Sequence, residues 1–214
     1  MDARTELQDR GEDTSRIGAL SDSIFGVALT LLVLDFRLPE SGAGGPLAPM
    51  LLLLWPKFWS FGLTFAVVGA FWIGHHRMLH LIVRYNRPLL WLNLLFLSLI
   101  TLVPFPTSLL GRFSPNRADA QMAWIMYSIN LALIGLSQFW VWRCALTNNL
   151  VREKISPRLA SNLGVRALTA PAVFFLSIGL SFGSPLMAYV SPFLILPVNA
   201  IVYHSYARMR ASAD

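Results

Sequence analysis

The sequence predicts an all-α, polytopic membrane protein with six transmembrane helices. Of its 214 residues 55% are hydrophobic and only 13% are charged, whereas soluble domains carry about 25% charged residues. Apolar runs near the roughly 20 residues that cross a bilayer recur along the chain. Lys and Arg gather between alternate runs. These three observations leave little chain for a soluble domain.

Proline and glycine mark the limits of six consecutive apolar segments. Pro56 and Pro88 stand near the starts of the second and third segments, where a helix tolerates proline in its first turn. Pro192 and Pro197 lie inside the sixth and predict a kink there. The segments cover residues 17–36, 51–76, 88–110, 120–143, 165–182 and 185–206.

The basic residues predict the orientation of the spans. Thirteen of the seventeen Lys and Arg residues lie in or beside the N-terminal segment, the second and fourth loops and the C-terminal tail. Such loops stay in the cytoplasm, so we expect both termini there, as an even number of spans requires. The chain then divides into a cytoplasmic segment (1–16), a six-helix domain (17–206) and a cytoplasmic tail (207–214).

The net charge of +6 does not indicate nucleic-acid binding, because most basic residues lie in the loops on one side of the predicted membrane. The single cysteine, Cys144, excludes an intramolecular disulfide and a multi-cysteine metal site. The N-terminus mixes acids and bases, unlike a signal peptide, so we expect the first apolar run to be retained.

The first apolar segment contains an aspartate, Asp22. A carboxylate inside a membrane helix is disfavoured by about 3 kcal/mol and needs partners. At 100° per residue Val27, Leu31 and Leu34 form one stripe with Thr30 beside it, and Asp22 points roughly the opposite way. The stripe could line a pathway, or it could be an ordinary packing surface.

The second segment offers partners for Asp22 near its cytoplasmic end. Trp72 and His75 are spaced i, i+3 and share a helix face. With Ser21 they could form a hydrogen-bonded cluster around the carboxylate. The third span adds Asn93, close to its cytoplasmic start. Such a cluster could equally lock helices together without any part in transport.

Two other polar groups invite a functional interpretation. His76 and His80 have the i, i+4 spacing of a helical metal site, but no third ligand stands nearby, so we expect no metal there. Asp35 with Arg37, at the outer end of the first span, could shape an extracellular mouth or could be a solvated helix end.

Three separate motifs in the first three spans, about half of the chain, follow one known pattern. They are Arg16-x-x-x-Leu20-Ser21-Asp22 with Ala28-x-Thr30-x-x-x-Leu34, Trp72-x-x-His75-x-Arg77, and Leu92-Asn93-Leu94 with Thr101-x-x-Pro104. Together they resemble the signature of the TMEM175 family of potassium channels. Leu20 departs from the pattern, because the family usually has phenylalanine there.

The resemblance implies a passive, potassium-permeable channel of the prokaryotic single-repeat type, in the plasma membrane. It implies a homotetramer whose pore is lined by the first helix of each subunit, without a TVGYG filter, which the chain lacks. The constriction falls on Val27, Leu31 and Leu34, and the threonine layer credited with selectivity on Thr30. The bracing network falls on Arg16, Ser21, Asp22, Trp72, His75, Arg77 and Asn93.

The same resemblance implies no cofactor and no metal beyond permeant K⁺ and other monovalent cations. Two alternatives stay open from the residues: a secondary transporter, although no 3+3 repeat is visible, and a membrane protein with a structural role. An enzyme is not expected. Asp22 is the one acid well inside a span, and no nucleophile or metal constellation accompanies it.

Overall fold

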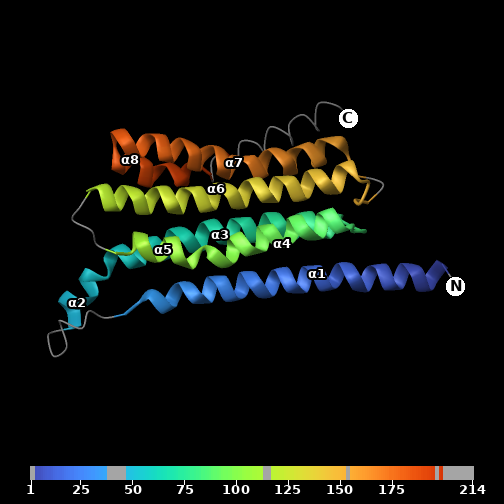
Figure 1. Ribbon diagram of the computed structural model, residues 1–214, viewed down its shortest axis with the longest axis horizontal. Coiled ribbons are helices and arrows are strands. Elements are labelled where there is room, and N and C mark those ends of the chain that lie inside the picture. The colour runs from blue at the N-terminus through green and yellow to red at the C-terminus, as the bar shows by residue number, and fades with distance from the viewer. Residues whose placement is uncertain (1–2, 38–46, 113–116, 153–154, 196–197, 200–214) are drawn as a thin grey trace, which may run out of the picture.

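The computed structural model describes residues 3–37, 47–112, 117–152, 155–195 and 198–199. In chain order the elements are α1 (Ala3–Leu31), η1 (Leu32–Asp35), α2 (Leu47–Leu53), α3 (Trp55–Leu81), α4 (Arg87–Leu102), α5 (Pro104–Leu110), α6 (Arg117–Thr147), α7 (Pro157–Gly183), α8 (Pro185–Val190) and η3 (Ser191–Leu194). The long helices run side by side (Figure 1). The predicted all-helical architecture is therefore confirmed.

Five segments of the described chain are long and apolar enough to cross a membrane. They are Ser15–Asp35, Trp55–Leu81, Arg87–Leu110, Arg117–Thr147 and Pro157–Gly183. The shorter apolar segment Pro185–Leu194 follows. It begins the predicted sixth span, most of whose remainder lies outside the described residues, as do the C-terminal tail and Pro197.

Prolines break two of the predicted spans rather than only starting them. The second is interrupted at Leu54, so that α3 begins at Trp55 with Pro56 in its first turn. The third is divided at Val103, because Pro104 has no amide hydrogen to continue the ladder of α4. The fourth and fifth helices extend beyond their predicted ends, since polar residues also continue a helix outside the bilayer.

The helices form layers, with α1 at one edge, α3, α4 and α5 beside it, then α6, and α7 with α8 at the far edge (Figure 1). α6 packs against both α4 and α7. Its close approach to α7 depends on Gly135, because a Cβ there would lie 2.4 Å from Cδ of Pro171. Small residues permit such approaches between membrane helices.

Polar side chains also join the helices inside this apolar bundle. Thr64 of α3 bonds Tyr127 of α6 at 3.1 Å and Thr107 of α5 at 3.2 Å. Trp124 of α6 donates to Ser177 of α7 at 2.7 Å. All five side chains are buried, so these bonds satisfy groups that hydrocarbon could not.

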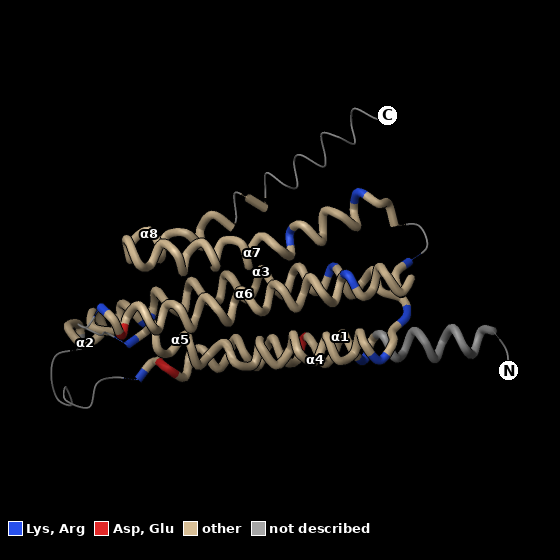
Figure 2. Tube along the Cα trace, turned by 45° about the horizontal axis from the view of Figure 1, so that its top comes forward, with Lys and Arg blue, Asp and Glu red and all other residues tan. Residues whose placement is uncertain are grey.

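Charged residues lie mainly toward the two ends of the bundle (Figure 2). At the end with the α3–α4 and α6–α7 connections, the two loops pair. Ile82 and Val151 form an isolated antiparallel bridge, and the amide of Arg152 donates to the carbonyl of Leu81 at 3.0 Å. The backbone thus links the end of α3 to the segment that follows α6.

Candidate functional site

One face of α1 packs into the bundle. Ser21, Phe25, Ala28 and Leu32, spaced at four, three and four residues, are each at most 4% exposed. The Phe25 ring lies 5.8 Å from that of Phe96 on α4. This row is the buried side of the helix, and the small residues Ser21 and Ala28 allow it to approach its neighbours closely.

The stripe predicted from helical phase lies on the surface of the single chain. Val27 is 56% exposed, Leu31 38% and Leu34 63%, and Thr30 is exposed beside them. No ionisable residue occurs between Asp22 and Asp35, so the stripe is uncharged along its whole length. It is an apolar surface interrupted by one threonine.

The hydroxyl of Thr30 is oriented by its own helix. Its Oγ1 donates to the carbonyl of Val27 at 2.8 Å. The hydroxyl proton is therefore used within the helix, and the lone pairs of the oxygen remain for an outside partner. Thr30 Oγ1 can therefore offer its lone pairs to a cation.

Two hydrogen bonds attach α1 to α3 beside this surface. Trp72 Nε1 donates to Asp22 Oδ1 at 2.8 Å, and His75 Nε2 lies 3.4 Å from Ser21 Oγ. Ser21 Oγ already donates to the carbonyl of Ile17 at 2.9 Å. His75 Nε2 is then the donor in this contact, and Nδ1 has no hydrogen-bond partner among the described residues. The structure thus brings together the four residues proposed to form a cluster.

Asp22 lies at the edge of the buried face of α1 and not inside the protein. Asp22 is exposed in the single chain, and its direction differs by about 90° from that of the Ser21 row. The row at residues 21, 25, 28 and 32 faces the bundle, whereas Asp22 lies at its edge, where Trp72 is itself 36% exposed. The carboxylate is held from the side.

The remaining motif residues are more scattered. Asn93 of α4 is buried, and its Oδ1 has no hydrogen-bond partner among the described residues. Arg16 and Arg77 are exposed. Arg77 lies at a cavity of about 540 Å³ that Gln138 and Ala167 also line, so it points toward α6 and α7. The structure does not join these three residues to the Trp72–Asp22 pair by hydrogen bonds.

The two other polar groups have local partners. His76 and His80 face each other with 3.0 Å between their Nε2 atoms, and no cluster of three or more potential metal ligands occurs in the described ranges. The carboxylate of Asp35 lies near Lys57 rather than the Arg37 side chain: Lys57 Nζ is 3.7 Å from Asp35 Oδ2 and donates to the Asp35 carbonyl at 2.6 Å. Arg37 contacts Asp35 through the backbone, where its amide donates to the same carbonyl at 2.9 Å. The Lys57 contact is one that sequence spacing could not indicate.

Comparisons with known proteins identify the family and the fold of the chain. The family described as "Endosomal/lysosomal potassium channel TMEM175" matches residues 16–104. A potassium channel of Streptomyces collinus is 30% identical over 173 residues, which cover 80% of this chain and 84% of that protein. The crystal structure of a lysosomal potassium-selective channel TMEM175 homolog from Chamaesiphon minutus has a TM-score of 0.76, at 29% identity, covering 89% of this chain and 97% of that chain.

An animal relative is longer. The endosomal/lysosomal proton channel TMEM175 of Bos taurus is 24% identical over 89% of this chain, but the match spans only 40% of that protein. The bacterial relative, by contrast, matches over most of both chains. On this likeness, over nearly its whole length and in its fold, the chain belongs to the TMEM175 family, a family of channels rather than enzymes.

Proposed function

We propose that the protein is a potassium-permeable cation channel whose pore is lined by α1. The observation that carries the proposal is the surface of that helix: one face is buried in the bundle, while the Val27–Thr30–Leu31–Leu34 stripe is exposed and uncharged. The potassium channel names of the similar bacterial proteins support the choice of ion.

Passage of ions along one helix requires several copies of it. A single stripe cannot enclose a pore, but the symmetry-related helices of a closed ring can. We propose a homotetramer, with α1 of each subunit at the axis and the rest of each bundle outside. The proposed setting is the plasma membrane of a prokaryote with both termini cytoplasmic, and 1–16 and 207–214 flanking the channel domain.

Each ring of the stripe has its own role in the proposal. Val27, Leu31 and Leu34 span about 10 Å along the helix axis and form apolar rings that block ions when the pore there loses its water. The hydroxyl oxygens of Thr30 replace part of the hydration shell of a potassium ion. Because their protons are bonded to the Val27 carbonyl, these oxygens favour cations over anions without any charged side chain.

The bracing network keeps this geometry in place. Trp72 holds the Asp22 carboxylate, and His75 holds Ser21 one residue earlier. These bonds fix the rotation of α1 about its own axis, since they lie about one and a half turns from Val27. The rotation of α1 decides which side chains face the axis.

Ion flux into liposomes tests the proposal. Vesicles that contain the protein and an outward potassium gradient are expected to lose K⁺ and to develop a membrane potential set by K⁺. With an equal sodium gradient, we expect slower flux. A pH-sensitive dye in the same vesicles measures proton entry, which the name of the bovine relative makes the second candidate. Absence of any flux, or flux that saturates and requires a counter-ion, would overturn the channel proposal in favour of a structural protein or a transporter.

A further inference from the structure

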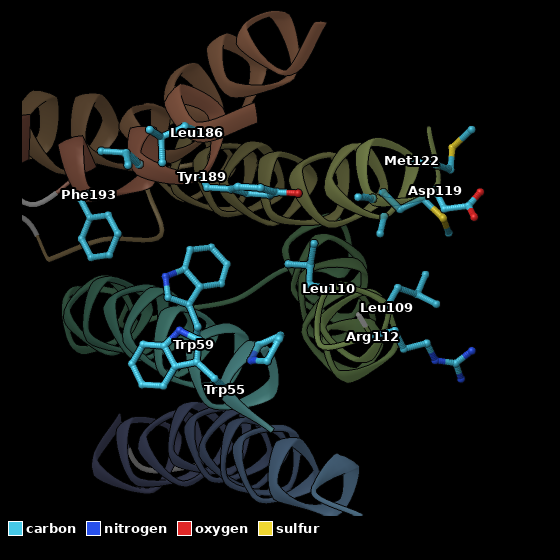
Figure 3. A pocket seen from close by; sticks show the side chains of 15 residues that line it. Trp55, Trp59, Leu109, Leu110, Arg112, Asp119, Met122, Leu186, Tyr189 and Phe193 are labelled. Carbon is cyan, nitrogen blue, oxygen red and sulfur yellow. The ribbon is translucent and has the colours of Figure 1, made fainter. Parts of the chain in front are cut away.

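An apolar groove of about 870 Å³ lies outside the stripe of α1, and no residue of α1 lines it. Its floor and walls come from α3, α5, α6 and the α8–η3 segment, and Figure 3 shows Trp59, Leu110, Tyr189 and Phe193 turned toward it. The volume is within the roughly 300–1,000 Å³ of typical ligand sites. The groove can therefore hold a molecule much larger than water.

Aromatic contacts keep one wall in a fixed position. The Tyr189 ring lies 4.6 Å from that of Trp124 and 5.7 Å from that of Trp59, both in edge-on geometry. Trp124 is in turn fixed by its bond to Ser177. Such a wall is rigid before any ligand binds, which lowers the entropy lost on binding.

Two charged groups stand at one end of this apolar space. Arg112, just after α5, and Asp119, in the first turn of α6, both line the groove and lie on its right-hand side in Figure 3, with Asp119 above Arg112. Both are exposed, and the Arg112 guanidinium forms no ion pair or hydrogen bond with another described residue. A guanidinium binds a phosphate through two parallel hydrogen bonds.

The position of the groove along the spans bears on the kind of ligand that can enter it. It lies at the ends of the spans, where Trp55 and Trp59 also line it, as tryptophans do at a membrane interface. The α3–α5 layer separates it from α1 (Figures 1 and 3). In the proposed tetramer α1 is at the axis, so the groove does not open to the pore.

We propose that this groove is a binding site for a phospholipid with a zwitterionic headgroup. An acyl chain occupies the space between Trp59 and Phe193, and the phosphate pairs with Arg112. The nearby carboxylate of Asp119 repels a second negative charge and attracts an ammonium group. Phosphatidylethanolamine fits this charge pattern better than phosphatidylglycerol. The proposal uses the tetramer only to place the groove at the periphery and does not depend on ion conduction.

Native mass spectrometry of the full chain, released from detergent with defined phosphatidylethanolamine or phosphatidylglycerol, measures this binding directly. We expect phosphatidylethanolamine to bind more tightly, and Arg112→Gln to weaken it by about tenfold, the loss typical of one hydrogen-bonded charge. Arg37→Gln removes an exposed positive charge that does not line the groove, and it is expected to leave binding unchanged. Equal binding of both lipids, or equal effects of the two substitutions, would overturn the headgroup assignment.

A second pair of variants tests the groove itself. Ala123→Trp fills it, since Ala123 lines it, whereas Ala172→Trp places the same side chain on an exposed position of α7. Only the first is expected to displace the lipid, with the oligomer unchanged. If Ala123→Trp instead separates the subunits, a second copy of the chain covers the groove and the lipid proposal is wrong. Liposome flux of both variants distinguishes failure of this site from failure of the channel proposal.

Discussion

Trp72 Nε1 lies 2.8 Å from Asp22 Oδ1, so α3 supplies a hydrogen-bond donor to a carboxylate placed within the apolar stretch of α1. The contact forms at the edge of the buried face, not under it. Asp22 therefore helps to attach α1 to α3. Because it is exposed in the single chain, a neighbouring subunit could also contact it.

Replacement of Trp72 by phenylalanine keeps an aromatic ring but removes the donor to Asp22. We expect the free energy of unfolding to fall by about 1 kcal/mol. This is less than the usual value for a hydrogen bond to a charged group, because both side chains are exposed in the single chain. The thermal midpoint and the tetramer fraction in detergent should both fall. Trp91→Phe is the matched control, since Trp91 is 72% exposed. Equal midpoints for the two variants would contradict the bracing role.

Thr30→Ala removes the oriented hydroxyl from the exposed stripe. The potassium-to-sodium permeability ratio should drop about fivefold, equal to roughly 1 kcal/mol of lost coordination. Thr30→Ser restores an oxygen and should recover most of the ratio. Thr101→Ala provides the control, because Thr101 is also exposed and also bonds its own helix, at Leu97. A ratio that is unchanged in Thr30→Ala would remove Thr30 from the selectivity layer.

Val27→Ala shortens the side chains of the first apolar ring. A wider, more easily wetted ring should raise the potassium flux severalfold and lower selectivity, while the protein still assembles. Val33→Ala makes the same deletion in η1, outside the stripe, where Val33 is 53% exposed against 56% for Val27. Potassium flux per reconstituted protein in liposomes, measured for both variants, distinguishes the two positions. Similar increases from both variants would show that the stripe does not line the pathway.

Gly135→Ala tests the contact between α6 and α7. The added methyl meets Pro171 Cδ at 2.4 Å, so the helices must separate, at a cost of about 1–3 kcal/mol. A Cβ added at Gly179 would have no neighbour within 4 Å, and Gly179→Ala should be neutral or stabilising by about 0.5–1 kcal/mol. Unfolding followed by circular dichroism separates these outcomes. A stable Gly135→Ala protein would refute the close approach.

Hydropathy and proline placement predict the order and the approximate positions of the first five spans because both act locally along the chain, whereas the helix ends differ by several residues. The interruptions at Leu54 and Val103 follow from Pro56 and Pro104, yet the sequence alone does not say whether such a proline starts a span or divides it. The bridge between Ile82 and Val151 joins residues far apart in sequence. No periodicity encodes a contact of that kind.

The candidate site was predictable in part. Spacing and family motifs indicated that Asp22, Ser21, Trp72 and His75 lie together. They did not indicate which face of α1 is buried, because hydrophobicity does not distinguish a protein contact from lipid or an apolar pore. The small residues Ser21 and Ala28, seven apart, were the available signal. The groove beside Arg112 depends on four separate elements and could not be inferred from any one of them.

The bridge between the Ile82 and Val151 loops has a mechanical consequence. Backbone hydrogen bonds connect the end of α3 to the segment after α6, so the half of α3 that carries Trp72 and His75 is expected to move together with that segment. α1, by contrast, is fastened to α3 beside its outer face by two side-chain hydrogen bonds. In the proposed tetramer, we expect a change in pore diameter to involve rotation or tilt of α1 relative to the linked α3 and α6.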